Sequence, residues 1–233
     1  MGIGIVGLVL MLGSPLVWIA SRPAESAGDA GAVEAAIRSA TSLSVTSSLA
    51  PAEPGAPATT TTTVTPSLRF TVSESTLVPV APAPIGLTIR GIDVDAPVKP
   101  FGVDRRSGEM DVPTNVRDVA WYRFGPSPGQ AGSAVLAAHV DLSSQGAGVF
   151  FNLRDLEPGE IVEVAYEDGS RQPFRVEARV RYDKAEIPLD VIFATDGPPV
   201  LTLITCGGGF NPSIESYDSN VVVYAYPVEG DIG

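Results

Sequence analysis

The chain has a single histidine and a single cysteine, and each ends an apolar run of residues typical of a β-strand. His139 closes the run AVLAAH, Cys206 closes the run LTLITC, and residues that interrupt a strand follow both. We therefore expect both side chains at strand ends, where they can face a groove. A cysteine attacks a carbonyl carbon as its thiolate, and a neighbouring imidazole is a common means of forming one near neutral pH. The pair predicts a nucleophile, Cys206, served by a general acid–base, His139.

Each of these two residues also has a structural interpretation. A lone histidine can be a hydrogen-bonded structural residue, and a lone cysteine can be a small buried hydrophobe. One cysteine excludes an intramolecular disulfide, and in an exported protein it indicates a reactive thiol or an intermolecular link. A redox-responsive surface domain that dimerises through Cys206 is therefore an alternative to an enzyme.

No cofactor is expected. One histidine and one cysteine are too few for a zinc site, although a calcium site made of carboxylates alone stays open. The glycine run 207–209 lacks the spacing of a phosphate-binding loop and more simply permits a turn beside the thiol. Asp141 is interpreted as a turn residue, with orientation of His139 or binding of a substrate amine as alternatives.

The composition bounds the class of protein and its partners. The 233 residues are 44% hydrophobic and 18% charged, with a net charge of −12, which suits a globular domain with an apolar appendage. No basic stripe follows residue 87, so nucleic acid is not an expected partner. An acidic surface favours cationic partners such as amines, although solubility is its commoner role.

The first residues predict a membrane segment. Residues 2–20 carry no charge and are long enough to span a bilayer as a helix, with Trp18 suited to the interface. We expect an N-terminal anchor over residues 1–21; a cleaved signal peptide is the alternative, although a basic leading region is missing. The folded domain would then lie outside the cytoplasm on a single-pass anchor.

Residues 22–84 predict a disordered linker. They are rich in Ala, Ser, Thr and Pro, include five consecutive threonines at 59–63, and offer little apolar surface to bury. A brief helix over residues 32–39 is conceivable, but nothing in the sequence requires one. Such a tether would hold the domain away from the bilayer.

Residues 85–228 predict one mainly β domain, followed by a short tail at 229–233. Short β-prone runs alternate with turn residues, and no segment has a convincing helical period. In residues 174–182, apolar positions alternate with Arg175, Glu177, Arg179 and Arg181, which predicts a half-buried strand with its charges facing water. A closed barrel is the expected architecture, and a sandwich is the alternative.

Several segments in order resemble the sortases, the membrane-anchored cysteine transpeptidases of Gram-positive surfaces. The likeness lies in residues 139–141 (HVD), 148–156 (GVFFNLRDL), 158–164 (PGEIVEV), 202–206 (TLITC) and 220–225 (NVVVYA). Residues 121–125 (WYRFG), together with the CGG that begins at Cys206, look most like the class E and F branches. The resemblance covers essentially the whole of residues 85–228.

This resemblance implies an eight-stranded sortase β-barrel in which the histidine and the cysteine flank a groove. Cys206 would attack the Thr–Gly carbonyl of a sorting signal similar to LPXTG and form a thioacyl enzyme. His139 would protonate the departing amine and then take a proton from the incoming one. The implied partners are secreted proteins that carry sorting signals and an amine of a cell-wall precursor; hydrolysis of the sorting signal is the other possible outcome.

The sequence departs from the family in one respect. Sortases add an arginine between the cysteine and the last strand, or at the start of that strand, and this chain has no Arg or Lys after Cys206. Asn220, at the start of the last strand, could donate a neutral hydrogen bond to the oxyanion instead, as amides do in other oxyanion holes.

The charges near that position are unfavourable, because Glu215 and Asp218 would disfavour both a thiolate and an oxyanion. An arginine from elsewhere, Arg123 or Arg181, is another candidate for the missing cation. The departure makes a catalytically impaired sortase fold, one that binds sorting peptides or wall fragments without turnover, an alternative to an active enzyme.

Overall fold

The computed structural model describes residues 26–45, 81–106, 108–213 and 216–228. The elements in chain order are β1 (Ala27–Gly28), α2 (Ala30–Val45), β2 (Pro84–Ile89), η2 (Arg90–Ile92), β3 (Val94–Phe101), β4 (Val119–Tyr122), β5 (Ser133–Ala137), β6 (Asp141–Leu142), β7 (Gly146–Ala147), η3 (Leu153–Asp155), β8 (Ile161–Tyr166), β9 (Arg171–Asp183), α3 (Leu189–Ile192), β10 (Val200–Asn211) and β11 (Ser216–Pro227). The expected anchor at 1–21 and tail at 229–233 lie outside the described residues. None of the helices within the described ranges has the length and apolar character needed to cross a bilayer.

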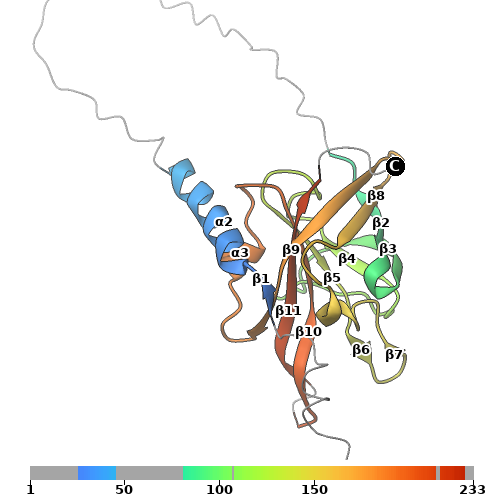
Figure 1. Ribbon diagram of the computed structural model, residues 1–233. Helices are drawn as coiled ribbons and strands as arrows, with labels where there is room; N and C mark the ends of the chain where they lie inside the picture. The colour runs from blue at the N-terminus through green and yellow to red at the C-terminus, as the bar shows by residue number, and fades with distance from the viewer. Residues whose placement is uncertain (1–25, 46–80, 107, 214–215, 229–233) are drawn as a thin grey trace, which may run out of the picture.

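Eight strands close into a barrel. The main sheet has the order β1-β9-β11-β10-β5-β4-β3-β2-β8, and β8 pairs again with β9 (Figure 1). This second pairing joins the two ends of the sheet, with β1 added outside the ring at β9. The prediction of a mainly β, closed eight-stranded barrel is confirmed, and the sandwich is not.

The parts of β10 and β11 remote from their hairpin end are largely buried on both faces, because the barrel interior covers one side and two helices cover the other. Leu201 and Leu203 point into the barrel core with Val223, whereas Val200 and Val222 pack outward in a second core with residues of α2 and α3. We call the helix-covered side the outer face. Burial on both sides explains why these strands are nearly continuous in apolar residues.

Strand β9 contains a bulge that changes which residues face inward. Val176 pairs with Ala225, but the next registered pair joins Ala178 to Tyr224, so Glu177 is the extra residue. The prediction that Arg179 faces water is therefore wrong: its side chain is buried and donates to the Leu156 carbonyl oxygen at 2.8 Å. It also donates to Glu157 Oε1 at 2.9 Å, so the buried charge is paired.

The range expected to be a linker contains structure. Within residues 22–84, β1 pairs with β9, and α2 lies alongside the outer face of β9 and α3 (Figure 1). Val33 and Ile37, one helical turn apart on α2, are both 1% exposed in the second core. Arg38 of α2 also donates to Asp190 of α3 at 3.1 Å. The folded unit thus begins before residue 85, because two apolar side chains on one helix face suffice to dock it; residues 46–80 lie outside the described part.

Candidate active site

The parallel pairing of β10 with β5 sets the positions of the cysteine and the histidine. The last registered pair joins Ile204 of β10 to Ala137 of β5. Two residues beyond this pair lie Cys206, still on β10, and His139, just past the end of β5. Residues two apart on a strand share a face, and Ile204 belongs to the outer face, so Cys206 belongs to it as well.

Hydrogen bonds keep the chain after β5 close to β10. Ala138 donates its backbone N–H to the Ile204 carbonyl oxygen at 3.3 Å. Its own carbonyl oxygen accepts a bond from the Thr205 hydroxyl at 2.7 Å. The backbone N–H and the carbonyl oxygen of Ala138 thus both tie the segment before His139 to the segment before Cys206.

The orientation of the His139 ring is set by a loop ahead of β4. His139 Nε2 lies 2.7 Å from the carbonyl oxygen of Pro113, and the imidazole is half-buried. A carbonyl oxygen only accepts hydrogen bonds, so Nε2 carries the hydrogen in this arrangement. Nδ1 is then the ring nitrogen able to take up or release a proton.

The backbone of His139 is also packed against the segment that follows the β6–β7 hairpin. Phe150 donates its N–H to the His139 carbonyl oxygen at 3.2 Å, and Gly148 donates to the Val140 carbonyl oxygen at 2.8 Å. A Cβ atom on Gly148 would lie 2.2 Å from the His139 carbonyl oxygen, so only glycine fits there. This contact explains why a glycine opens the segment 148–156.

Asn220 lies directly beside Cys206 on β11. The two are Cα partners in the antiparallel β10–β11 pairing, and Asn220 is in turn the partner of Tyr182 on β9. Partners across a ladder share a face, so Cys206, Asn220 and Tyr182 form one lateral row on the outer face. The Asn220 side chain is therefore a lateral neighbour of the Cys206 side chain.

The surroundings of Cys206 favour the neutral thiol. Burial raises the pKa of Cys206, and the carboxylates of Asp141 and Glu109 raise it further, whereas the charge of Lys184 lowers it. The net direction is upward. The thiol is therefore mostly protonated near neutral pH, and ionisation requires a proton acceptor or a cation close by.

Asp141 forms a contact that its interpretation as a turn residue did not anticipate. Its Oδ2 accepts a hydrogen bond from the Tyr217 hydroxyl at 2.7 Å, which links the β6–β7 hairpin to β11. This bond is the main cause that raises the pKa of Tyr217 to about 12. Nothing local in the sequence relates two residues so far apart, and Tyr217 was not among the expected site residues.

The expected alternative cations, Arg123 and Arg181, do not lie in the lateral row. The Arg123 guanidinium stacks 4.9 Å from the centre of the Phe124 ring, beyond the end of β4. Arg181 pairs with Val221, whose side chain belongs to the barrel core, so it points away from the outer face. The cation whose charge lowers the pKa of Cys206 is instead Lys184, and the sequence offered no signal that would single it out.

Asp218, which stands where a cation was expected, is bound locally. Its Oδ1 accepts bonds from the Gly209 backbone N–H at 3.1 Å and from the Ser219 hydroxyl at 2.5 Å. These two bonds are the main causes that lower the pKa of Asp218, and the nearby charge of Arg181 contributes. Asp218 is therefore an exposed anion bonded at the irregularity in the β10–β11 pairing, between Gly207 and Phe210.

Ile204, two residues before Cys206 on the outer face, is one of the partly buried apolar side chains packed on the second core. Met110, Tyr122, Ile187 and Phe193 are among the others. The Tyr122 and Phe193 rings meet edge to face, with centroids 5.1 Å apart. Within the described ranges, no group of three or more His, Cys, Asp or Glu side chains is arranged to hold a metal ion.

Three solved sortases resemble the chain at low identity. Sortase A from Corynebacterium diphtheriae, in a lid-mutant form, is 21% identical with a TM-score of 0.49, over 65% of this chain and 73% of that one. Sortase C-1 from Actinomyces oris is 24% identical with a TM-score of 0.47, over 62% and 73%. Sortase C1 from Streptococcus agalactiae is 19% identical with a TM-score of 0.49, over 64% and 69%. Likenesses at this level do not transfer an activity or a site, and the class E and F resemblance stays a prediction.

The sequence assigns the chain to a protein family more firmly than these structural likenesses do. No curated protein matches it closely enough to count as a relative. A family model described as the sortase domain, however, matches residues 87–228, which is more than half of the chain. The protein therefore belongs to the sortase family, whose members are cysteine transpeptidases.

Proposed function

We propose that this protein cleaves a sorting signal similar to LPXTG and transfers the cleaved protein to a cell-wall amine. The observation that carries the proposal is the pairing of β10 with β5, because the single cysteine and the single histidine each follow its last pair by two residues. Membership of the sortase family supports the same reaction class.

Cys206 is the proposed nucleophile. Its thiol proton passes to Nδ1 of His139, and the thiolate attacks the carbonyl carbon of the Thr–Gly peptide bond. The carbonyl oxygen becomes an oxyanion, for which the Asn220 amide is the proposed donor from the neighbouring strand. When the C–N bond breaks, the proton on Nδ1 goes to the departing amine and leaves a thioester on Cys206.

The second half of the reaction reverses these proton transfers. The incoming amine attacks the thioester, and His139 Nδ1 accepts the proton that the amine loses. As the C–S bond breaks, the imidazolium returns that proton to the sulfur of Cys206. One imidazole thus serves both halves, and the product is a new amide bond.

The surroundings of the cysteine suit both substrates. Ile204, two residues before Cys206 on the outer face, offers apolar contact area for the leucine or proline of a sorting signal. Asp141 and Glu109, whose charges act on Cys206, would attract an amine that is protonated in water.

The proposed location is the outer side of a cell membrane, with residues 1–21 as a single-pass anchor. The uncharged stretch 2–20 and the general association of sortases with cell surfaces support this location. Fractionation of cells that express the full chain tests it, because a cleaved signal would release a shorter protein into the medium.

The test of activity uses the full chain, a quenched LPXTG peptide and triglycine as the acceptor amine. We expect cleavage with formation of the triglycine adduct by the wild-type protein and none by Cys206→Ala. Ser143→Ala, at an exposed position of the β6–β7 turn, is the control for a small surface change. Cleavage that persists in Cys206→Ala would refute the assigned nucleophile.

A second candidate function is binding of sorting peptides or wall fragments without turnover. The raised pKa of Cys206 and the lack of any Arg or Lys after it favour this candidate. Saturable binding of the peptide, with neither cleavage nor a trapped thioester, would establish it. The redox alternative predicts instead a disulfide-linked dimer, to which the half-buried position of Cys206 gives poor access.

A further inference from the structure

Formation of the Cys206 thiolate requires a source of positive charge on the outer face. An ionised sulfur requires positive charge nearby when burial and two carboxylates oppose its formation. No Arg or Lys follows Cys206 in the chain, so strand β11 cannot provide one. The cation has to come from another strand.

Lys184 comes from the strand on the other side of β11. Strand β9 ends at Asp183, whose Cα partner on β11 is Ser219. The Lys184 backbone N–H then donates to the Asp218 carbonyl oxygen at 3.1 Å, so the ladder continues for one more residue. Lys184 therefore lies beside Asp218, the residue that occupies the place of the expected cation.

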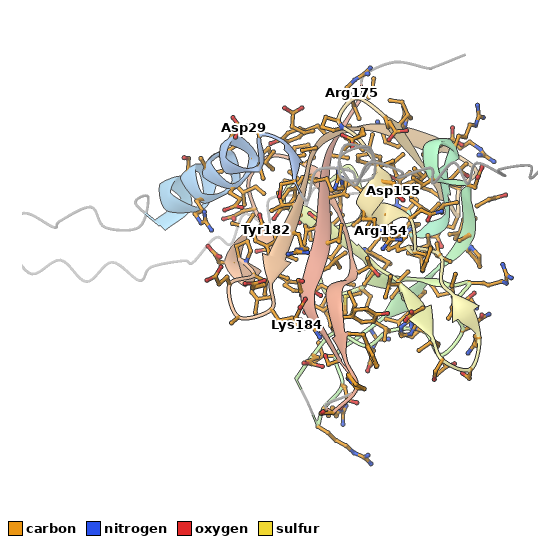
Figure 2. The ribbon with its side chains drawn as sticks, turned by 60° about the horizontal axis from the view of Figure 1, so that its bottom comes forward. Asp29, Arg154, Asp155, Arg175, Tyr182 and Lys184 are labelled. Carbon is orange, nitrogen blue, oxygen red and sulfur yellow. The ribbon has the colours of Figure 1, made fainter. Side chains whose placement is uncertain are left out.

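The side chain of Lys184 belongs to the outer face. It follows Tyr182 by two residues, and Tyr182 lies in the lateral row with Asn220 and Cys206. Figure 2 shows Tyr182 and Lys184 along the β9–β11 side of the barrel, with Lys184 nearer the free end of the β10–β11 hairpin. Arg181, the residue between Tyr182 and Asp183, faces the other way.

The ammonium group of Lys184 is held close to β11. Its Nζ donates to the Ser216 hydroxyl at 2.7 Å. This partner is neutral, so the bond fixes the position of the ammonium without cancelling its charge. Among the charged groups that act on the Cys206 thiol, Lys184 has the largest effect, and it is the one that lowers the thiol pKa.

We propose that Lys184, delivered from β9, provides the positive charge that stabilises the ionised sulfur of Cys206 in place of a cation on β11. Lys184 acts through Cys206 and needs no contact with a substrate. The positive charge expected on β11 is thus provided by the adjacent strand, β9. Asp218 occupies the expected position on β11, and Lys184 lies beside it at the end of β9.

The experiment measures alkylation of Cys206 by iodoacetamide as a function of pH in the full chain. At pH 7 we expect the rate to fall about threefold to tenfold in Lys184→Gln, and the pH profile to move to higher pH. Lys184→Arg should keep the rate within about twofold, because it keeps the charge. Lys99→Gln is the matched control, since Lys99 is the other lysine of the chain and pairs with Asp118 at 2.6 Å.

Two results would overturn the proposal: an unchanged pH profile in Lys184→Gln, or an equal loss in Lys184→Arg, which would assign the effect to the Ser216 bond rather than to charge. Lys184→Met is the second uncharged variant if Lys184→Gln does not fold, and it should show the same slower alkylation. The proposal is independent of peptide turnover, because alkylation needs no sorting signal. A chain that cleaves no peptide but loses alkylation rate in Lys184→Gln would refute the proposed function and support this inference.

Discussion

Nε2 of His139 lies 2.7 Å from the carbonyl oxygen of Pro113, a buried residue of the loop that precedes β4. The carbonyl holds one ring nitrogen as a donor and leaves proton exchange to the other. In the proposed mechanism, the loop ahead of β4 therefore contributes by orienting the His139 ring.

Removing the imidazole while keeping the bond to Pro113 separates the two roles of His139. The amide nitrogen of His139→Gln can replace Nε2 as a donor, but nothing replaces Nδ1. We expect peptide turnover to fall about 10²–10⁴-fold in both His139→Gln and His139→Ala. The free energy of unfolding should fall in His139→Ala alone, by about 1 kcal/mol. Turnover that survives in His139→Gln would exclude proton transfer through Nδ1.

Gly148→Ala should displace the backbone of His139. The added Cβ would lie 2.2 Å from the His139 carbonyl oxygen, so the segment has to shift. We expect a loss of about 1–3 kcal/mol in the free energy of unfolding, measured by urea denaturation, and a matching loss of turnover. In the control Gly31→Ala the added Cβ would lie 3.5 Å from the nearest atom, and stability should change by less than about 1 kcal/mol.

The bond between Tyr217 and Asp141 should appear in the alkaline titration of the phenol. The pKa of Tyr217 is raised from 10.0 to about 12, chiefly by this hydrogen bond. In Asp141→Asn the Tyr217 pKa should return toward 10.0, which an ultraviolet difference titration against Tyr217→Phe would detect. Asp155→Asn, an exposed carboxylate on η3, is the control.

The same shift predicts a loss of stability at high pH. A phenol whose pKa is higher in the folded state than in the unfolded state stabilises the fold fully below pH 10.0, and this contribution is lost as the pH rises to about 12. Tyr217→Phe should therefore lose less stability than the wild-type protein between these two pH values. Equal losses would show that other groups control the alkaline transition.

Arg179 should contribute far more to the free energy of unfolding than Arg175 on the same strand. Its buried guanidinium satisfies the Leu156 carbonyl and pairs with Glu157, so Arg179→Ala leaves both a cavity and an unpaired buried carbonyl. We expect a loss of about 2–4 kcal/mol in the free energy of unfolding. Arg175→Ala, at an exposed position, should cost less than about 0.5 kcal/mol. Similar values for the two variants would show that the pairing of Arg179 contributes nothing.

Because α2 docks on the barrel, we expect the stability of the barrel to depend on this helix, which is remote in the sequence. Ile37 is 1% exposed between α2 and the outer face, so Ile37→Ala should lower the free energy of unfolding by about 2–4 kcal/mol. Ser39→Ala, on the exposed side of the same helix, should change it by less than about 0.5 kcal/mol. A single cooperative transition in both variants would show that helix and barrel unfold together.

The strands were predictable because their signals are local. Apolar runs and turn residues identify β10 and β11, and the two chemical residues stand out because each is the only one of its type. The bulge at Glu177 could not be predicted from the alternating sequence. One extra residue turns the following side chains to the opposite side of the sheet without changing the alternation of apolar and charged residues. This is why Arg179 was assigned to the surface.

The features that the sequence did not reveal depend on contacts between distant residues. Helix α2 is rich in alanine and serine, and its Val33 and Ile37 side chains need a partner surface, which the barrel provides. Lys184 likewise has no distinguishing neighbours in the sequence. Its importance arises from the register of β9 against β11, which no local pattern encodes.

The attachment of α2 to the barrel changes how near the domain can stand to a bilayer. If residues 1–21 cross the membrane, only residues 22–26 separate them from β1, a reach of at most about 18 Å at about 3.5 Å per residue. Residues 46–80 would then join two docked elements of one domain and would not act as a spacer. Such an enzyme would work within a few nanometres of the lipid headgroups, and a substrate still emerging from the membrane would come within its reach.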